Sequence, residues 1–408
     1  MGNATDMNDF DSELCERLAL LREQGLFREL RRVDSPQSAR IEIDGRTLLN
    51  FSSNDYLGLA NHPALVEAAI RAVERYGAGA GASRLICGSL APHHELEETL
   101  AAFKGAEAAL AFSTGYSAAM GTICALMGSE DIIIVDKLIH ACIVDAARLS
   151  GAKLRVFRHN DLNDLERLLR WAGEKTGNSN NSGKPSRSRV LVVTESVFSM
   201  DGDQAPLREI VELKSKYGAW LMVDEAHATG LYGQKRRGLA EESGVQEQIE
   251  IQMGTLGKAL GAAGGYICGS RLLVEYLINR ARSLIFSTAP VPAAVAAATA
   301  GVRLVQSELG EERRKALWQL VSVLPGELAP QIPSAIVPIH IGDEARAVET
   351  GAALRRKGIF IPAIRYPTVS RGRARLRLTL TAAHTKRDLD ELQSALALVR
   401  PSQLSNLS

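Results

Sequence analysis

Short apolar runs and amphipathic segments alternate through the middle of the chain, from about residue 92 to 285. The apolar runs are continuous and short, which is typical of strands buried on both faces, and the segments between them have helical periodicity. The pattern predicts helices at 93–104, 115–127, 140–149, 161–172 and 206–217, and strands at 107–112, 131–135, 154–157, 189–195 and 219–224. This alternation indicates an α/β protein with a mostly parallel sheet covered by helices.

The two ends of the chain carry separate patterns. Residues 14–30 have leucines at helical spacing, and residues 40–49 alternate around an Asp44-Gly45 turn, which predicts a hairpin. Beyond Pro292 an alanine-rich helix leads to a smaller α/β unit, with strands at 334–340 and 374–380 and helices at 343–357 and 385–398. We therefore expect an N-terminal helix and hairpin (1–50), a large domain (51–288) and a small C-terminal domain (289–408).

Composition and charge narrow the class of protein. The chain has 408 residues, of which 46% are hydrophobic, so it can bury large cores. Its 48 basic and 47 acidic side chains nearly cancel, so we expect neither nucleic acid nor a membrane as partner. The five cysteines are scattered without metal-ligand spacing, and the N-terminus lacks a secretory signal, so we expect a cytoplasmic protein without a metal site. Residues 173–189 are rich in Ser, Asn and Gly, which predicts a polar surface insertion.

The strongest chemical signal lies between residues 219 and 265. An apolar strand ends in Asp224-Glu-Ala-His227, and the carboxyl end of a strand is where open α/β sheets place their chemistry. Lys258 follows among glycines and small residues, which suits an amine that attacks a carbonyl. A surface loop is the alternative for the lysine alone. A phosphate-binding P-loop is excluded because Gln252 and Ala259 occupy positions that it requires as Gly and Ser or Thr.

Asp224, His227 and Lys258, in this order, resemble the pyridoxal-phosphate enzymes of the aspartate-aminotransferase fold. The stretch Thr255-Leu-Gly-Lys-Ala-Leu-Gly-Ala-Ala-Gly264 is similar to the lysine signature of the α-oxoamine synthases, which condense an amino acid with an acyl thioester. The resemblance covers roughly residues 15–400. It implies a large domain with a mostly parallel sheet, a smaller C-terminal α/β domain, and pyridoxal 5'-phosphate as the cofactor.

The resemblance also implies residue roles in catalysis. Lys258 would hold the cofactor and then move the Cα proton of the amino acid. Asp224 would keep the pyridine nitrogen protonated, because a nearby carboxylate favours the charged form. His227 would bind the phenolic oxygen of the ring. His140 would stack on the ring, contact substrate and assist as an acid in the acyl steps.

Further cofactor contacts are implied where a strand ends and a helix begins, at residues 112–117, since helix N-termini bind phosphate. Small hydroxyl residues there are also ordinary helix caps. The cofactor contacts that the resemblance adds are Gly115, Tyr116, Ser199, Thr255 and Thr288. The Thr288 segment would reach the phosphate of a neighbouring subunit, which implies a homodimer with shared active sites.

For the substrates, the resemblance selects Arg28 after the first helix, Asn54, Thr368 and one arginine of a C-terminal strand. Arg373, Arg375 and Arg377 alternate on one strand face, which is either a solvated edge or a carboxylate clamp. The second arginine of the family's Arg-Leu-Arg-Leu motif binds carboxylate, and Arg377 is its match.

Residues 363–369 and 375–385 look most like family members that join L-alanine to a pimeloyl thioester in biotin synthesis, releasing CO₂ and free thiol. The thioester carrier would be coenzyme A or acyl carrier protein. Members that use glycine and an acetyl thioester, or another α-oxoamine synthase, are the alternative. A catalytically silent partner subunit of this fold would lack the lysine, whereas Lys258 is present. A dinucleotide-binding dehydrogenase is disfavoured because no Gly-x-Gly-x-x-Gly follows an early strand.

Overall fold

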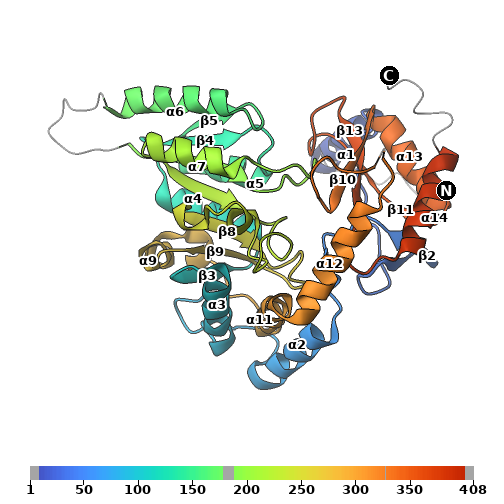
Figure 1. The fold of residues 1–408 in the computed structure, drawn as a ribbon, viewed down its shortest axis with the longest axis horizontal. Coiled ribbons are helices and arrows are strands. Elements are labelled where there is room, and N and C mark those ends of the chain that lie inside the picture. Colours follow the sequence, from blue (N-terminus) through green and yellow to red (C-terminus); the bar gives the residue numbers. More distant parts are fainter. Residues whose placement is uncertain (1–8, 178–187, 327, 400–408) are drawn as a thin grey trace.

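The structure, a computed structural model, describes residues 9–177, 188–326 and 328–399 (Figure 1). A seven-stranded sheet with the order β3-β9-β8-β7-β6-β4-β5 forms the centre of the larger part. Its strands are β3 Ala108–Phe112, β4 Ile132–Asp136, β5 Lys153–Phe157, β6 Val190–Glu195, β7 Trp220–Asp224, β8 Ile251–Thr255 and β9 Gly265–Gly269. Only β9 runs antiparallel to its neighbours, so the predicted mostly parallel sheet is confirmed.

Both faces of this sheet are buried because alternate strand residues belong to different cores. In β4, Ile132 and Ile134 pack into one hydrophobic cluster, and Ile133 and Val135 pack into the other. The first face is covered by α3 Ala91–Lys104, α6 Leu162–Gly177 and α7 Leu207–Lys216. The second is covered by α4 Gly115–Leu126, α5 Ala141–Ser150, α9 Arg271–Arg280 and α10 Arg282–Ile285. Short segments α8 Leu239–Glu242 and a 3-10 turn, Gln246–Gln248, follow β7.

The smaller C-terminal unit contains a second, antiparallel sheet. Its strand order is β10-β13-β12, with β10 Ile336–Gly342, β12 Ala363–Ile364 and β13 Ala374–Thr379. The helices α13 Glu344–Arg356 and α14 Lys386–Val399 belong to the same unit (Figure 1). The central position of β13 buries Arg375 and Arg377, so the solvated-edge interpretation of these arginines is wrong.

The predicted N-terminal hairpin is present as β1 Arg40–Ile43 and β2 Arg46–Asn50. Asp44 and Gly45 both have positive φ, as a tight two-residue hairpin turn requires. β2 also pairs in parallel with β11 Ile359–Phe360. The hairpin therefore packs with the C-terminal part of the chain, and the three-part division at 50 and 288 stays a prediction.

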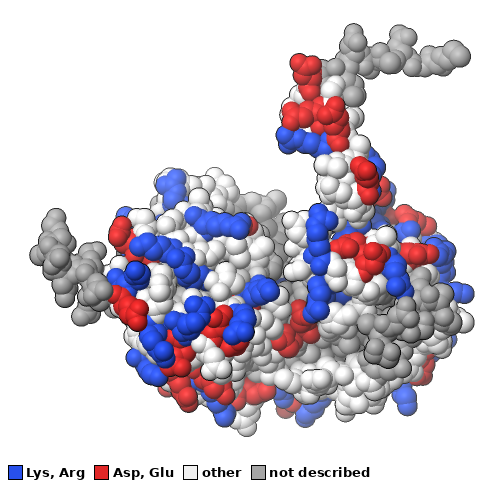
Figure 2. Space-filling model, turned by 90° about the horizontal axis from the view of Figure 1, so that it is seen from above, with Lys and Arg blue, Asp and Glu red and all other residues white. Residues whose placement is uncertain are grey.

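Three more helices are α2 Pro63–Tyr76, α11 Pro292–Gln306 and α12 Glu308–Ser322. In Figure 1, α2 and α11 pack together at the bottom of the view, and α12 runs from there toward the small unit. The first helix, α1 Asp9–Glu23, ends earlier than predicted, since Gly25 takes a left-handed φ of 66°. Its Leu14, Leu18 and Leu21 are each 39% exposed, and Figure 2 shows this segment projecting from the body. No helix within the described ranges is long and apolar enough to cross a membrane.

The expected polar insertion at 173–189 is only partly described. Its first residues, 173–177, form the last turn of α6 and were therefore wrongly predicted as non-helical. Residues 178–187 lie outside the described residues.

Candidate active site

Two carboxylates lie side by side at the carboxyl edge of the large sheet. Asp224 ends β7, and Glu195 ends β6 directly opposite in the parallel register. Both are buried: Asp224 Oδ1 accepts from Ala226 N at 2.9 Å, and Glu195 Oε2 accepts from Ser199 N at 3.1 Å. Burial raises the pKa of both carboxyl groups, and the neighbouring Asp224 charge helps to raise that of Glu195 to about 8. The pair therefore favours a cation beside it.

Lys258 supplies an amine at this edge. It lies in the loop between β8 and β9, and its Nζ is 2.7 Å from Nε2 of His227. The residue as a whole is partly exposed, but its amine lies against the buried His227 ring. Desolvation lowers the pKa of Lys258 to about 8, although the charges of Asp224 and Glu195 oppose this. A substantial neutral fraction near pH 7 to 8 suits both nucleophilic attack and proton transfer.

His227 is held from both ring nitrogens. Its Nδ1 is 2.5 Å from the hydroxyl of Tyr56, which is buried, and its Nε2 faces Lys258. Burial, together with the charges of Lys258 and Arg377, lowers the pKa of His227 well below its usual value. The imidazole is therefore neutral and can offer one donor and one acceptor.

Glycines let the chain segments approach closely around this centre. Gly261 has a φ of 68°, and a Cβ there would lie 2.5 Å from Cβ of Leu59. A Cβ on Gly265 would lie 2.5 Å from the backbone of Gly115, the first residue of α4. The absence of a side chain at 265 thus brings the α4 N-terminus against β9, beside the lysine loop.

The α4 N-terminus forms a cluster of donors. Thr114 is the N-cap, and its Oγ1 accepts from Ser117 N at 3.0 Å. The N–H groups of Gly115 and Tyr116 stand in the first turn, where a helix offers them no acceptor of its own. The Tyr116 hydroxyl donates to Asp145 Oδ2 at 2.6 Å. This arrangement suits an anion.

His140 caps the start of α5. Its Nδ1 accepts from Cys142 N at 3.2 Å and lies 3.0 Å from Cys142 Sγ. Because Nδ1 accepts, the proton of the neutral ring is on Nε2. His140 is exposed and follows the carboxyl end of β4, which pairs with β6, so it lies at the same edge of the sheet as Glu195 and Asp224.

Arg377 joins the small unit to this site. Its Nε donates to Ser199 O at 2.5 Å, and its Nη1 donates to Asn54 Oδ1 and Thr379 Oγ1, both at 3.0 Å. Its Nη2 lies 3.4 Å from the Tyr56 hydroxyl. The structure therefore gathers two of the predicted substrate residues, Asn54 and Arg377, beside the His227 and Lys258 cluster.

Two other predicted substrate residues, Arg28 and Thr368, lie together at a second place. Arg28 Nη2 donates to Tyr366 O at 3.0 Å, two residues before Thr368, and both Arg28 and Thr368 are exposed. Arg365 hydrogen-bonds to the carbonyls of Gly25 and Phe27 from the same turn. No hydrogen bond among the described residues joins Arg28 or Thr368 to Lys258. Their role toward substrate stays a prediction.

Two predicted cofactor residues have structural contacts. Thr255 Oγ1 donates to Gly264 O at 2.9 Å and accepts from Gly257 N at 3.2 Å, so it shapes the lysine loop. Thr288 is exposed and forms an isolated bridge with Ser83, away from Lys258 in the described contacts. This placement is compatible with reaching a neighbouring subunit.

Sequence reasoning missed Tyr56 and Glu195. Tyr56 lies two residues after the predicted Asn54, and Glu195 ends a strand that was correctly predicted. A buried acid at the end of a strand adjacent to that of Asp224 is a signal that could have identified Glu195.

The residues present fit pyridoxal phosphate. The cofactor needs a carboxylate for its ring nitrogen, an amine for its carbonyl carbon and N–H donors for its phosphate. Asp224, Lys258 and the α4 N-terminus provide these three groups. In addition, Glu195 Oε1 is buried without a hydrogen-bond partner among the described residues, so the site has an unused acceptor.

Comparisons with known proteins agree with this chemistry. Residues 46–396 match the family described as Aminotransferase class I and II. The chain is 48% identical over 390 residues to the 8-amino-7-oxononanoate synthase of Geotalea daltonii, covering 94% of this chain and 96% of that protein. It is 47% identical over 388 residues to the enzyme of that name from Geobacter sulfurreducens, with coverages of 94% and 96%.

Solved structures share the fold. A lysine-to-alanine variant of serine palmitoyltransferase from S. paucimobilis, solved with a bound PLP–myriocin aldimine, has a TM-score of 0.86 and 30% identity, and the match covers 97% of this chain and 99% of that one. The 8-amino-7-oxononanoate synthase of Francisella tularensis has a TM-score of 0.70 and 28% identity, with coverages of 86% and 96%.

Proposed function

Because this chain belongs to the α-oxoamine synthases, within the aminotransferase class I and II family, we propose that it condenses L-alanine with a pimeloyl thioester. The products are 8-amino-7-oxononanoate, CO₂ and free thiol, in biotin synthesis. The observation that carries the proposal is the Lys258 amine, with a lowered pKa, held against neutral His227 beside Asp224. Relatives named 8-amino-7-oxononanoate synthase support the choice of substrates.

Pyridoxal phosphate, when bound, supplies a carbonyl carbon for amines and a ring that withdraws electrons from Cα. Asp224 would hold a proton at the ring nitrogen, since burial leaves its charge unscreened. His227, oriented by Tyr56, would donate to the phenolic oxygen. Gly115 and Tyr116 at the α4 N-terminus would bind the phosphate, with Ser199, Thr255 and a partner subunit's Thr288 segment completing the contacts.

Lys258 would move the Cα proton, because an amine with a pKa of about 8 both accepts and returns protons near neutral pH. Arg377 would bind the substrate carboxylate, with Asn54 beside it. Four of its five N–H groups have acceptors in the described contacts, which leaves one Nη2 N–H for substrate. His140, with its proton on Nε2, would donate to the acyl oxygen.

The chain would act as a homodimer. Leu85, Ile86 and Phe286 are 50%, 79% and 70% exposed, on two segments that the bridge between Ser83 and Thr288 joins. Exposed apolar groups gathered on adjoining segments are typical of an interface. Sedimentation should give twice the chain mass of 44.0 kDa, whereas a fully active monomer would contradict shared sites.

The experiment that tests the function is turnover with a matrix of substrates. L-Alanine and glycine are each combined with pimeloyl and acetyl thioesters of coenzyme A, and with pimeloyl-acyl carrier protein. We expect the highest kcat/KM for L-alanine with a pimeloyl thioester. Because each buried methylene contributes about 0.8 kcal/mol, acetyl should be processed poorly. A preference for glycine with acetyl-coenzyme A would overturn the substrate assignment and leave the cofactor chemistry in place.

A further inference from the structure

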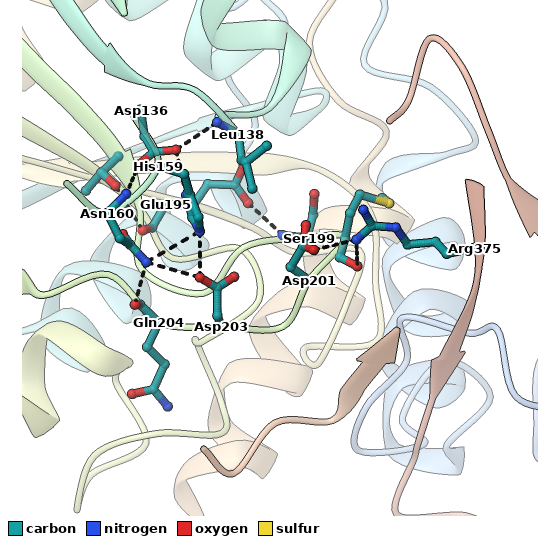
Figure 3. A network of polar contacts seen from close by, with 12 residues as sticks. Asp136, Leu138, His159, Asn160, Glu195, Ser199, Asp201, Asp203, Gln204 and Arg375 are labelled. Carbon is teal, nitrogen blue, oxygen red and sulfur yellow. Dashed lines mark hydrogen bonds and ion pairs between the residues drawn. The ribbon is translucent and has the colours of Figure 1, made fainter. Parts of the chain in front are cut away.

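Two turns flank the candidate site, and one side chain joins them. The first turn follows β4 and leads from Asp136 to His140. The second follows β6 and carries Ser199, whose carbonyl accepts from Arg377. His159, which follows β5, lies between these turns with one ring nitrogen toward each (Figure 3).

His159 bridges two carboxylates. Its Nδ1 is 2.9 Å from Asp136 Oδ1, and its Nε2 is 2.6 Å from Asp203 Oδ2. Asp136 is fully buried and also accepts from Leu138 N at 2.7 Å and from Asn160 N at 2.9 Å. Each ring nitrogen of His159 faces a carboxylate oxygen, which accepts, so both nitrogens act as donors and the ring is an imidazolium.

The electrostatics agree with this assignment. Burial alone would lower the pKa of His159, but its hydrogen bonds to Asp136 and Asp203 and their charges raise it to about 10. The Phe198 ring meets the imidazole edge-on with centroids 4.4 Å apart. Because this pKa lies well above neutrality, the bridge keeps its charge through the neutral range.

The second turn is held from two sides. On the side of the large sheet, Asp203 binds His159, and Asn160 Nδ2 donates to Asp203 Oδ2 and Gln204 O, both at 3.1 Å. On the side of the small unit, Asp201 pairs with Arg375. Gly202 has a φ of 75°, and a Cβ there would lie 2.3 Å from Ile336 O of β10. The turn therefore packs tightly between the two sheets, so a shift of the turn relative to one sheet also shifts it relative to the other.

We infer that His159 is a positioning residue: it fixes the His140 turn and the Ser199 turn relative to each other, so that Arg377 faces the amino-acid carboxylate. The inference rests on the proposed function for the identity of that amino acid. His159 itself has no described contact with Lys258, Asp224 or Arg377, so it acts through Asp136, Asp203 and the Phe198 ring.

The matched control lies at the opposite edge of the same strands. Asp131 precedes β4 and is buried, and its carboxylate binds the Arg189 guanidinium at 2.7 Å just before β6. This ion pair ties the amino ends of β4 and β6, as His159 ties segments after their carboxyl ends. Removing either bridge should lower the melting temperature, but only the His159 bridge adjoins the site.

The test compares His159→Gln with Asp131→Asn in the holoenzyme. Binding of L-alanine without thioester is followed by the absorbance of bound cofactor. His159→Gln should raise the Kd of L-alanine about tenfold to 100-fold, since a small misplacement of a binding group is costly. Asp131→Asn should change it less than about twofold. Equal Kd changes in both variants, with lowered melting temperatures, would make His159 merely structural and overturn the inference.

A milder variant protects the test against misfolding. Asp203→Asn keeps the shape of a side chain that is 36% exposed and removes one charge of the bridge. It should raise the Kd less than His159→Gln does. The double variant should match His159→Gln within about twofold, because both act through one contact, whereas multiplied effects would contradict a single bridge. If the wild type responds to glycine and not to L-alanine, the proposed substrate fails, and the same comparison is made with glycine.

Discussion

Two lysines, Lys104 and Lys258, place their amines near the carboxyl end of β7, and the groups that surround the two amines differ in charge. Lys104 is fully buried, and its Nζ binds Glu225 Oε2 at 2.6 Å and the carbonyl of Arg237. The Glu225 charge outweighs desolvation and raises the Lys104 pKa above its usual value. Lys258 has neutral His227 as its hydrogen-bond partner, and its pKa falls to about 8.

The difference teaches that a buried lysine is made reactive by its partner. Asp224 and Glu225 are adjacent in sequence, yet Glu225 is paired with Lys104 and also accepts from Ala240 N at 2.9 Å. A lysine held by a full ion pair is locked in its charged, non-nucleophilic form. A lysine opposite a neutral imidazole can lose its proton and attack a carbonyl.

The largest expected effect is on catalysis by the second lysine. Lys258→Ala should lower kcat with L-alanine and pimeloyl-coenzyme A by about 10⁴-fold, since it removes the proton-transfer group. The cofactor should still bind through its ring and phosphate contacts, as measured by fluorescence titration. Activity within tenfold of the wild type would show that another group moves the proton.

The next effect is on stability at the first lysine. Lys104→Met should destabilise the fold by about 3–5 kcal/mol, because it leaves the Glu225 charge buried without its partner. Urea unfolding measures this loss. The double variant Lys104→Met with Glu225→Gln should recover part of it. Little change in unfolding free energy for the single variant would mean that Glu225 takes up a proton or finds another partner.

The pH dependence of stability separates the lysines further. The folded-state pKa of Lys258, about 8, lies below the ordinary 10.5, so the unfolded chain binds more protons between these values and stability rises with pH there. In cofactor-free protein, wild type relative to Lys258→Met should gain up to about 3 kcal/mol from pH 8 to 10.5. Urea unfolding at both pH values tests this. A constant difference would refute the lowered pKa.

Arg377→Ala should raise the KM for L-alanine by the equivalent of about 1.5–3 kcal/mol, as expected for a hydrogen bond to a charged group. The variant also frees Ser199 O and Asn54, so Asn54→Ala serves as the control, with a smaller rise expected. If cofactor affinity fell while the KM stayed constant, Arg377 would be structural.

The smallest effect is expected at Tyr56. Tyr56→Phe removes the hydroxyl 2.5 Å from His227 Nδ1 and should cost about 1 kcal/mol of transition-state stabilisation, roughly fivefold in kcat/KM. The shape of the side chain is retained, so the melting temperature should change little. A loss as large as that of Lys258→Ala would give Tyr56 a direct part in the chemistry.

Most of the large sheet was predictable because its strands are continuous apolar runs with helices between them. The strands β8 and β9 were not predicted, since β8 contains Gln252 and β9 begins and ends with glycine. The leucine pattern predicted a helix over residues 14–30, whereas α1 spans Asp9–Glu23. The periodicity of the leucines does not show that Gly25 has a left-handed φ and ends the helix.

The site was predicted where its residues lie close in sequence or carry a family motif. Asp224, His227 and Lys258 follow one another within 35 residues, and the structure brings the Lys258 amine to His227, three residues after Asp224. Tyr56 contacts His227, and His159 contacts Asp203, over long separations in sequence. A pattern of neighbouring residues cannot predict such contacts. The burial of Arg375 and Arg377 depended on β13 being central, which strand periodicity alone does not determine.

The most direct test of the account is to reduce the holoenzyme with borohydride and map the peptide to which the cofactor becomes attached. Lys258, with a low pKa and a neutral partner, should carry the label, and Lys104 should carry none. A label on Lys104 or on any other lysine, or no covalent label at all, would contradict the assignment of Lys258 as the reactive amine.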